Sequence, residues 1–267
     1  MKKYKAELVR IGKISGMLYQ VEGAETSTLV IYGIGAPLSP DSGNLPDTTS
    51  ILNHNVDLLV PDYIGYGRSE GDFTPVNCIR TFLVLYDQLT KGCVAKSNYK
   101  NTEYKLKYRR IIIIGKSFAG AYIPLLPRYD KRIKELCAIC PVLDWTRCGR
   151  IDGEETIKGF MNAMELDGYK HLYRGICSKT WEKHFKNEDS LSPIKNIKYL
   201  DRVKLFIGHG MEDKNIHYSN SVRYYEKLIK QHPTNEYQYK LRLYKHCDHS
   251  SATSNRAVND YMKWINI

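Results

Sequence analysis

The segment GKSFAG, residues 115–120, places one serine among small residues directly after four consecutive isoleucines. The isoleucine run favours a buried strand, and a helical pattern begins at Phe118. A strand, a sharp turn and a helix in this order present the side chain at the turn to the edge of a sheet. Small residues at Gly115 and Ala119 allow strand and helix to pass closely. The pattern predicts Ser117 as a nucleophile, with Ala119 where the G-x-S-x-G motif has its last glycine.

A serine nucleophile needs a base to remove its proton and an acid to orient that base. Two late segments contain these residue types: GHGMED places Asp213 after an expected strand, and HCDHSS places His246 and His249 after the last expected strand. The order along the chain is therefore serine, acid, histidine. Asp144 follows another expected strand and is the alternative acid. The residues alone leave both histidines open as the base.

Backbone amides near Ser117 are candidates for stabilising a developing oxyanion. The helix after Ser117 directs its amino terminus toward the cleft, which makes the Phe118 N–H one expected donor. A second donor is expected in the turn GIGAP, residues 33–37, where the N–H of Ile34 is the candidate and that of Gly35 the alternative. The other interpretation of this turn is a simple glycine-rich connection.

Elements that would position these residues follow from the hydrophobic pattern. An antiparallel hairpin is expected first, and then short apolar runs alternate with helical stretches, which is typical of a mostly parallel sheet covered on both faces. Expected strands are 5–11, 17–21, 28–32, 57–60, 110–114, 136–140, 203–207 and 239–244, and expected helices are 48–53, 76–89, 118–126, 219–230 and 253–265. Ligands of such α/β sheets bind at the carboxyl ends of the strands.

The segment of about 145–192 interrupts this alternation. Its residues Ile157, Phe160, Met161 and Met164 recur at helical spacing, which predicts a helical cap inserted into one α/β domain over residues 1–267. The same apolar stripe would also suit a core within the insertion.

Composition excludes several classes of protein. A chain of 267 residues with 42% hydrophobic and 26% charged residues is typical of a globular domain. The net charge of +11 is spread along the chain, and its densest patch, Lys105–Arg110, is interpreted as a solvated edge, so no nucleic-acid partner is expected. A polar start, no apolar run of membrane-spanning length and seven scattered cysteines predict a cytoplasmic protein with reduced thiols. Cys137 and Cys140 are expected to be core thiols, and no metal or cofactor is expected.

Taken in order, these segments resemble the α/β-hydrolase-fold serine hydrolases, in the esterase and serine-aminopeptidase-like branch. The motifs that carry the resemblance are Tyr32-Gly33-Ile34-Gly35, PDYIGYGRSEG at 61–71, GKSFAG, and GHGMED with HCDHSS. The resemblance implies Ser117 as nucleophile, Asp213 as acid, His249 as base, and backbone donors at Phe118 and Ile34. It favours His249 over His246 because small residues follow His249. Tyr32 stands where the family often has histidine.

The expected activity is cleavage of carboxylic esters, or of amides and thioesters, through an acyl-enzyme intermediate. Its substrate would be a small acyl ester or a short peptide. A peptidase or an acyltransferase with the same triad is the alternative enzyme, and a non-catalytic binding protein of the same fold is the alternative from another class. The sequence predicts neither the acyl group nor the oligomeric state.

Overall fold

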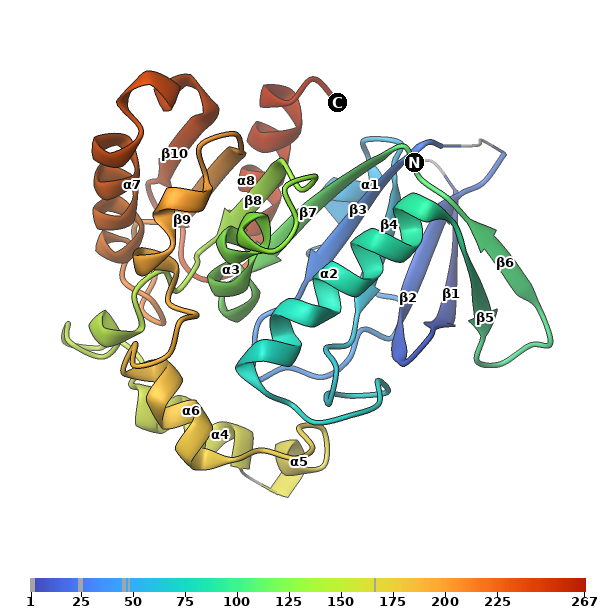
Figure 1. The fold of residues 1–267 in the computed structure, drawn as a ribbon, viewed down its shortest axis with the longest axis horizontal. Helices are drawn as coiled ribbons and strands as arrows, with labels where there is room; N and C mark the ends of the chain where they lie inside the picture. Colours follow the sequence, from blue (N-terminus) through green and yellow to red (C-terminus); the bar gives the residue numbers. More distant parts are fainter. Residues whose placement is uncertain (1–2, 24–25, 45–46, 48, 166) are drawn as a thin grey trace.

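A computed structural model describes residues 3–23, 26–44, 47, 49–165 and 167–267. One ten-stranded sheet runs through the protein in the order β10-β9-β8-β7-β3-β4-β2-β1-β5-β6 (Figure 1). The six strands from β10 to β4 are parallel, and the other four join them antiparallel. The strands are β1 (Tyr4–Ile11), β2 (Ile14–Val21), β3 (Thr28–Gly33), β4 (Asp57–Pro61), β5 (Cys93–Ser97), β6 (Glu103–Leu106), β7 (Arg110–Lys116), β8 (Glu135–Ile139), β9 (Lys204–Gly210) and β10 (Tyr239–Tyr244).

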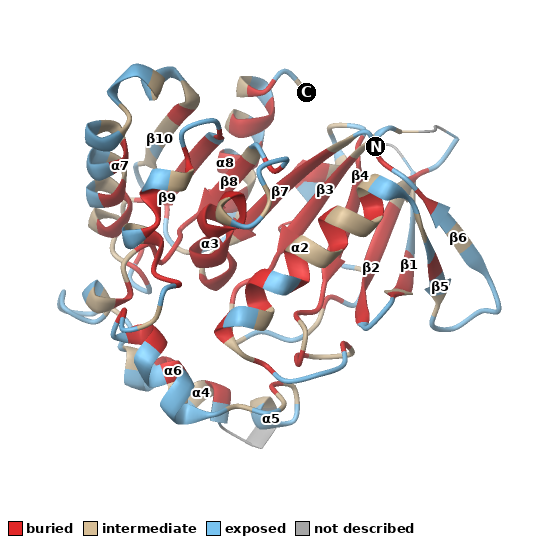
Figure 2. Ribbon diagram, viewed as in Figure 1, coloured by how far each residue is buried: buried red, intermediate tan, exposed pale blue. Residues whose placement is uncertain are grey.

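Helices cover both faces of the sheet. The helices are α1 (Thr49–Leu52), α2 (Pro75–Lys91), α3 (Phe118–Tyr122), α4 (Ile157–Glu165), α5 (Asp167–Lys170), α6 (Ser178–Phe185), α7 (Ser219–Gln231) and α8 (Ser251–Trp264). The helices α2, α3 and α7 lie on one face, while α1 and α8 pack together on the other. The parallel strands between these layers are largely buried (Figure 2), except for the edge strand β10, most of whose residues are only partly buried. The α/β-hydrolase fold predicted from the sequence is confirmed.

The register of β3 against β7 brings two predicted motifs together. Gly33 pairs with Gly115, so both strands end at the same level of the sheet. A Cβ added to Gly33 would lie 2.6 Å from Phe82 Cζ and 2.7 Å from Ala119 Cβ. The glycine therefore leaves the space that the methyl group of Ala119 occupies, which explains why alanine fits where the motif has glycine.

Two strands were not expected from the sequence. The hairpin β5–β6 extends the sheet beyond β1, and most residues of its two short strands are exposed or half-buried, with only Ala95 and Leu106 buried. The interpretation of Lys105–Arg110 as a solvated edge was incomplete, because this segment also includes the end of β6 and the start of β7.

Several element boundaries differ from the expected ones. The helix expected at 118–126 stops as an α-helix at Tyr122 and continues as a 3-10 helix over Ile123–Arg128, since Pro124 has no N–H to donate to the preceding turn. β2 begins earlier than expected and includes Gly16, where an added Cβ would lie 2.7 Å from the Val60 carbonyl oxygen. Thr48, the first residue of the expected first helix, lies outside the described residues.

The helices α4, α5 and α6 lie between β8 and β9 in the chain and extend beyond the carboxyl ends of the parallel strands, as the predicted helical cap does (Figure 1). Aromatic side chains attach this cap to the sheet. Phe160 of α4 stacks on Phe118 with ring centroids 5.7 Å apart, and Trp181 of α6 stacks on Phe73 at 5.1 Å. Part of the cap's apolar stripe therefore packs onto the residue that follows Ser117.

All seven cysteines are free thiols. Burial raises the pKa of the Cys137 thiol well above its ordinary value, as expected for a core cysteine. Within the described part of the chain, no helix has the length and apolar character of a membrane span.

Candidate active site

Ser117 occupies a strained turn between β7 and α3. Its backbone has φ 54° and ψ −117°, a region that residues with a Cβ rarely adopt, and its N–H donates to the Ile139 carbonyl at 2.7 Å. A Cβ on Gly115 would lie 2.9 Å from the Ala119 carbonyl carbon, and one on Gly120 would lie 2.6 Å from Pro141 Cβ. These contacts allow only glycine at both positions without a local shift. The turn has the tight geometry that the sequence indicated.

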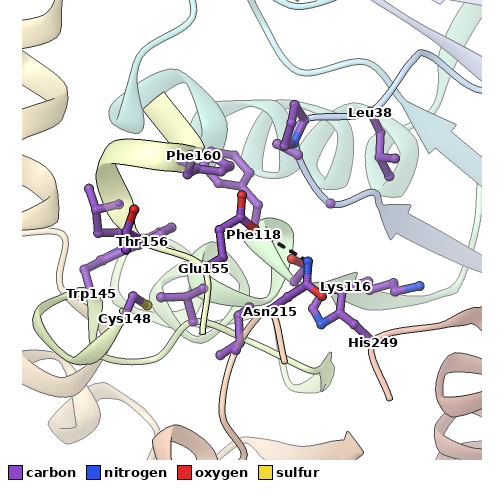
Figure 3. A pocket seen from close by; sticks show the side chains of 17 residues that line it. Leu38, Lys116, Phe118, Trp145, Cys148, Glu155, Thr156, Phe160, Asn215 and His249 are labelled. Atoms are coloured by element: carbon purple, nitrogen blue, oxygen red, sulfur yellow. Dashed lines mark hydrogen bonds between the residues drawn. The ribbon is translucent and has the colours of Figure 1, made fainter. Parts of the chain in front are cut away.

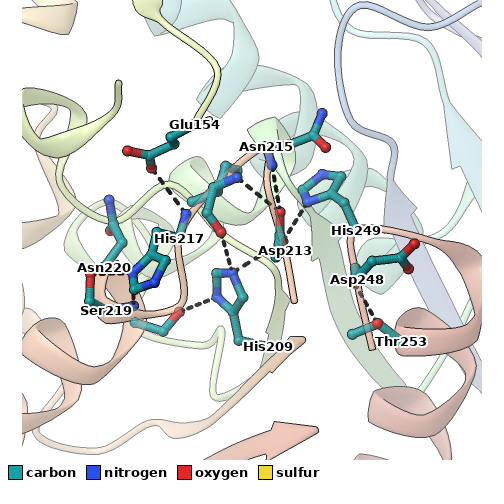
Figure 4. Close-up of polar contacts among 12 residues, drawn as sticks. Glu154, His209, Asp213, Asn215, His217, Ser219, Asn220, Asp248, His249 and Thr253 are labelled. Atoms are coloured by element: carbon teal, nitrogen blue, oxygen red, sulfur yellow. Dashed lines mark hydrogen bonds and ion pairs between the residues drawn. The ribbon is translucent and has the colours of Figure 1, made fainter. Parts of the chain in front are cut away.

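Asp213 and His249 form a hydrogen-bonded pair at the ends of β9 and β10. His249 Nδ1 lies 2.7 Å from Asp213 Oδ2, and the backbone N–H groups of Asn215 and Ile216 each donate to Asp213 Oδ1 at 2.9 Å (Figure 4). Burial by itself would raise the pKa of the Asp213 carboxyl, but hydrogen bonds from His209 and His249 hold that pKa well below its ordinary value. Asp213 is therefore an anion near neutral pH.

The alternative acid and base lie elsewhere. The His246 side chain is 89% exposed and pairs with Glu212 at 3.0 Å. Asp144 accepts hydrogen bonds from Thr146 and from the Asn187 side chain, which fixes the turn after β8. The structure thus brings Asp213 together with His249 and places the two alternatives in other local networks.

One pocket of about 320 Å³ contains Ser117 and His249 in its lining (Figure 3). Phe118 and Gly35 also line it, and a Cβ on Gly35 would lie 3.1 Å from Ser117 Cβ. Ile34 is buried one residue earlier, and its carbonyl accepts a hydrogen bond from the Tyr63 hydroxyl at 2.6 Å. The turn after β3 therefore lies directly beside the nucleophilic turn, with Gly35 closer to the pocket than Ile34.

The opposite wall of this pocket comes from the cap. Trp145, Ile157 and Phe160 supply apolar surface, and the exposed carboxylate of Glu155 extends into the space between them and Asn215 (Figure 3). Helical spacing in the sequence marks Ile157 and Phe160 as residues of the predicted cap, whereas no motif marks Trp145 or Glu155 as pocket residues.

Lys116, next to the proposed nucleophile, has its ammonium group paired with a carboxylate. Its Nζ lies 2.9 Å from Asp47 Oδ2, and the side chains are only 12% and 9% exposed. The Tyr32 hydroxyl donates to the same carboxylate at 2.9 Å. Tyr32 and Lys116 thus share the Asp47 carboxylate.

The motif PDYIGYGRSEG forms a tight turn away from the pocket lining. Asp62 Oδ2 accepts from the Arg68 backbone N–H at 2.7 Å and from Arg68 Nε at 2.8 Å. Gly65 has φ 83°, and an added Cβ there would lie 2.0 Å from the Asp72 carbonyl carbon. These contacts support the structural interpretation of the motif.

One group of possible metal ligands lies within the described residues, namely Cys140, His209 and Asp213, with ligand atoms within 4.8 Å of one another. Both nitrogens of His209 already contact protein groups, and both carboxylate oxygens of Asp213 already accept hydrogen bonds. Protein contacts therefore account for this cluster.

The fold is that of the α/β-hydrolases. Residues 87–266 match the model of the prolyl oligopeptidase family, and the chain belongs to that family. No curated protein matches the chain.

Solved structures share the fold at low sequence identity. A putative dipeptidyl aminopeptidase IV from Bacteroides ovatus matches with a TM-score of 0.61 and 16% identity, covering 100% of this chain and 35% of that chain. A putative esterase from Staphylococcus aureus has a TM-score of 0.65 and 16% identity over 100% and 85% of the two chains. Est1E from Butyrivibrio proteoclasticus has a TM-score of 0.62 and 17% identity over 98% and 99%. This chain thus spans about a third of the first of these proteins.

Proposed function

We propose that Ser117, His249 and Asp213 form a catalytic triad that cleaves carboxylic esters. The observation that carries the proposal is the pairing of Asp213 with His249, whose imidazole lines the same pocket as Ser117. The bond to Asp213 fixes the proton of neutral His249 on Nδ1, which leaves Nε2 as the nitrogen that accepts the serine proton.

The reaction would proceed in two halves. Ser117 Oγ attacks the ester carbonyl as His249 takes its proton, and the alcohol leaves with that proton. Water then attacks the acyl-enzyme with His249 again as base, and the carboxylic acid is released. Asp213, already an anion, stabilises the imidazolium in each half.

Backbone N–H groups would stabilise the oxyanion. The Phe118 N–H is at the first residue of α3, where the helix leaves its early donors free. We propose the second donor in the turn after β3, at Ile34 or at Gly35; the pocket lining favours Gly35.

The cap would select the substrate. We propose a single domain over residues 1–267, in which the insertion of about 145–192 contributes the apolar wall at Trp145, Ile157 and Phe160. A small acyl ester fits a pocket of about 320 Å³ with this wall.

An amide or short-peptide substrate is the second candidate, and Glu155 favours it. Its carboxylate projects into the pocket and accepts a 3.5 Å hydrogen bond from the Asn215 side chain. A carboxylate there would attract an ammonium group. Rates on p-nitrophenyl esters compared with aminoacyl amides of the same acyl group separate the two candidates.

A covalent test addresses the nucleophile. A fluorophosphonate probe should label wild-type protein, and Ser117→Ala should abolish both labelling and ester hydrolysis. Ser42→Ala, at an exposed serine outside the pocket, is the matched control and should label as wild type. Labelling that survives in Ser117→Ala would reject the assignment, and an unlabelled wild type would favour the non-catalytic alternative.

A further inference from the structure

A second imidazole contacts the carboxylate of Asp213. His209, in β9, is completely buried, and its Nε2 lies 3.2 Å from Asp213 Oδ2 and 2.8 Å from the Ile216 carbonyl oxygen (Figure 4). Its Nδ1 lies 2.7 Å from Ser221 Oγ of α7. His209 therefore bridges β9, the loop that carries Asp213, and the first turns of α7.

These contacts determine which nitrogen of neutral His209 carries the proton. The Ile216 carbonyl can only accept a hydrogen bond, so the proton is on Nε2 and is shared with the nearby Asp213 oxygen. Nδ1 is then the acceptor, and the Ser221 hydroxyl donates to it. Ser221 consequently keeps His209 in the tautomer that donates toward Asp213.

The carboxylate of Asp213 is held from both sides as a result. The Asn215 and Ile216 N–H groups fix Oδ1, and the two imidazoles fix Oδ2. A carboxylate with four donors cannot rotate without losing some of them. Its orientation relative to His249 therefore depends on His209 as well as on its own loop.

We infer that His209 is a positioning residue that holds Asp213 in the orientation that meets His249, with Ser221 fixing the tautomer of His209. This inference rests on the proposed triad. It adds a residue that does not itself line the pocket and that acts through its contacts with Asp213 and the Ile216 carbonyl.

Two amide substitutions of His209 test whether it positions Asp213 or only fills space in the core. The Nε2 of glutamine in His209→Gln can reach the position of the imidazole Nε2, whereas the amide nitrogen in His209→Asn reaches only the position of Nδ1. Both variants are polar and smaller than histidine. We expect kcat for a p-nitrophenyl ester to fall by roughly tenfold in His209→Asn and by no more than about threefold in His209→Gln, with KM within about twofold of wild type in both.

Ser221→Ala tests the tautomer without touching the imidazole. We expect a decrease in kcat of about threefold, because His209 is then free to place its proton on Nδ1. His217→Gln is the matched control, since His217 Nδ1 contacts Ser219 Oγ at 2.8 Å in the same loop region and its side chain makes no recorded contact with Asp213. That control should keep wild-type kcat.

All rates are taken per active site, counted by titration with the fluorophosphonate probe, so that loss of folded protein does not count as loss of kcat. Wild-type kcat in Ser221→Ala and in every soluble His209 variant would overturn the inference, as would equal losses in His209→Gln and His209→Asn. Activity that survives Ser117→Ala would instead reject the proposed triad, whatever the His209 variants show.

Discussion

At the scale of single residues, the site depends on a buried anion, Asp213, whose two carboxylate oxygens both contact nitrogen atoms of the protein. Asp213 is 3% exposed, and an unpaired carboxylate at that depth would lose much of its hydration free energy. Two backbone N–H groups and two imidazoles replace the lost water. The result is a charge that needs no rearrangement when His249 takes up a proton.

This arrangement predicts how stability depends on pH. The folded-state pKa of Asp213 is lowered, so its contribution to stability is complete above the unfolded-state pKa of about 3.9 and is lost as the pH falls toward the lower folded-state value. Asp213→Asn removes the titrating group. The difference in unfolding free energy between wild type and Asp213→Asn, measured by urea denaturation, should therefore narrow between pH 6 and pH 3.

Asp248→Asn provides the control, because Asp248 is an exposed carboxylate in the loop that carries His249. The difference in unfolding free energy between wild type and Asp248→Asn should be small at pH 6. If the difference in unfolding free energy between wild type and Asp213→Asn widens as the pH falls, Asp213 is not the buried anion described above.

Much of the site was predictable at this scale because its residues follow predicted strands. Ser117, Asp213 and His249 each occur just after a strand, and parallel strands collect their carboxyl ends at one edge. The contact between His209 and Asp213 was not predictable, since it depends on how the loop after β9 folds back. Glu155 likewise reaches the pocket through the path of the cap, which leaves no periodic signal in the sequence.

At the scale of elements, the two glycines around Ser117 determine how closely β7 and α3 approach. Buried strands were predictable from their continuous apolar runs, whereas the register of β3 against β7, which pairs Thr28 with Arg110 and Gly33 with Gly115, comes from the structure. The hairpin β5–β6 was not predictable, because its short and mostly exposed or half-buried strands lack the apolar pattern that identifies a strand.

Gly120→Ala should destabilise the protein by about 1–3 kcal/mol, since the new Cβ would lie 2.6 Å from Pro141 Cβ and 3.0 Å from Pro141 Cα. Gly159→Ala in α4 is the matched control, because its nearest contact is the Thr156 hydroxyl at 3.2 Å. That control should be neutral or stabilising, as alanine favours a helix. Thermal unfolding measures both, and a Gly120→Ala protein as stable as wild type would show that α3 and β8 have room to move apart.

At the scale of the whole molecule, the cap and the sheet share one aromatic core. Phe118 contacts Tyr63 from the turn after β4, Phe73 from the loop before α2, and Phe160 and Trp181 from the cap, with ring centroids 5.7–6.0 Å apart. The residue proposed to donate to the oxyanion therefore carries the side chain on which the cap rests.

Phe160→Ala should enlarge the pocket, because Phe160 lines it and is 8% exposed. We expect kcat/KM for longer p-nitrophenyl acyl esters to rise relative to acetate, with a loss of unfolding free energy of about 3 kcal/mol. Met161→Ala on the same helix, outside that lining, is the control and should leave the order of chain lengths unchanged. An unaltered chain-length profile in Phe160→Ala would exclude the cap wall as the selective surface.

Hydrogen bonds also connect the segment before α4 to the loop after β9, which carries Asp213. Glu154 accepts a hydrogen bond from the His217 backbone N–H at 3.0 Å, and Glu155 accepts one from Asn215 at 3.5 Å. A substrate that displaces Glu154 and Glu155 must break these two hydrogen bonds or move the loop that carries Asp213. Displacement of that loop would also disturb the contact between Asp213 and His249. We therefore expect an ester that is too large for the pocket to be hydrolysed slowly even when it binds.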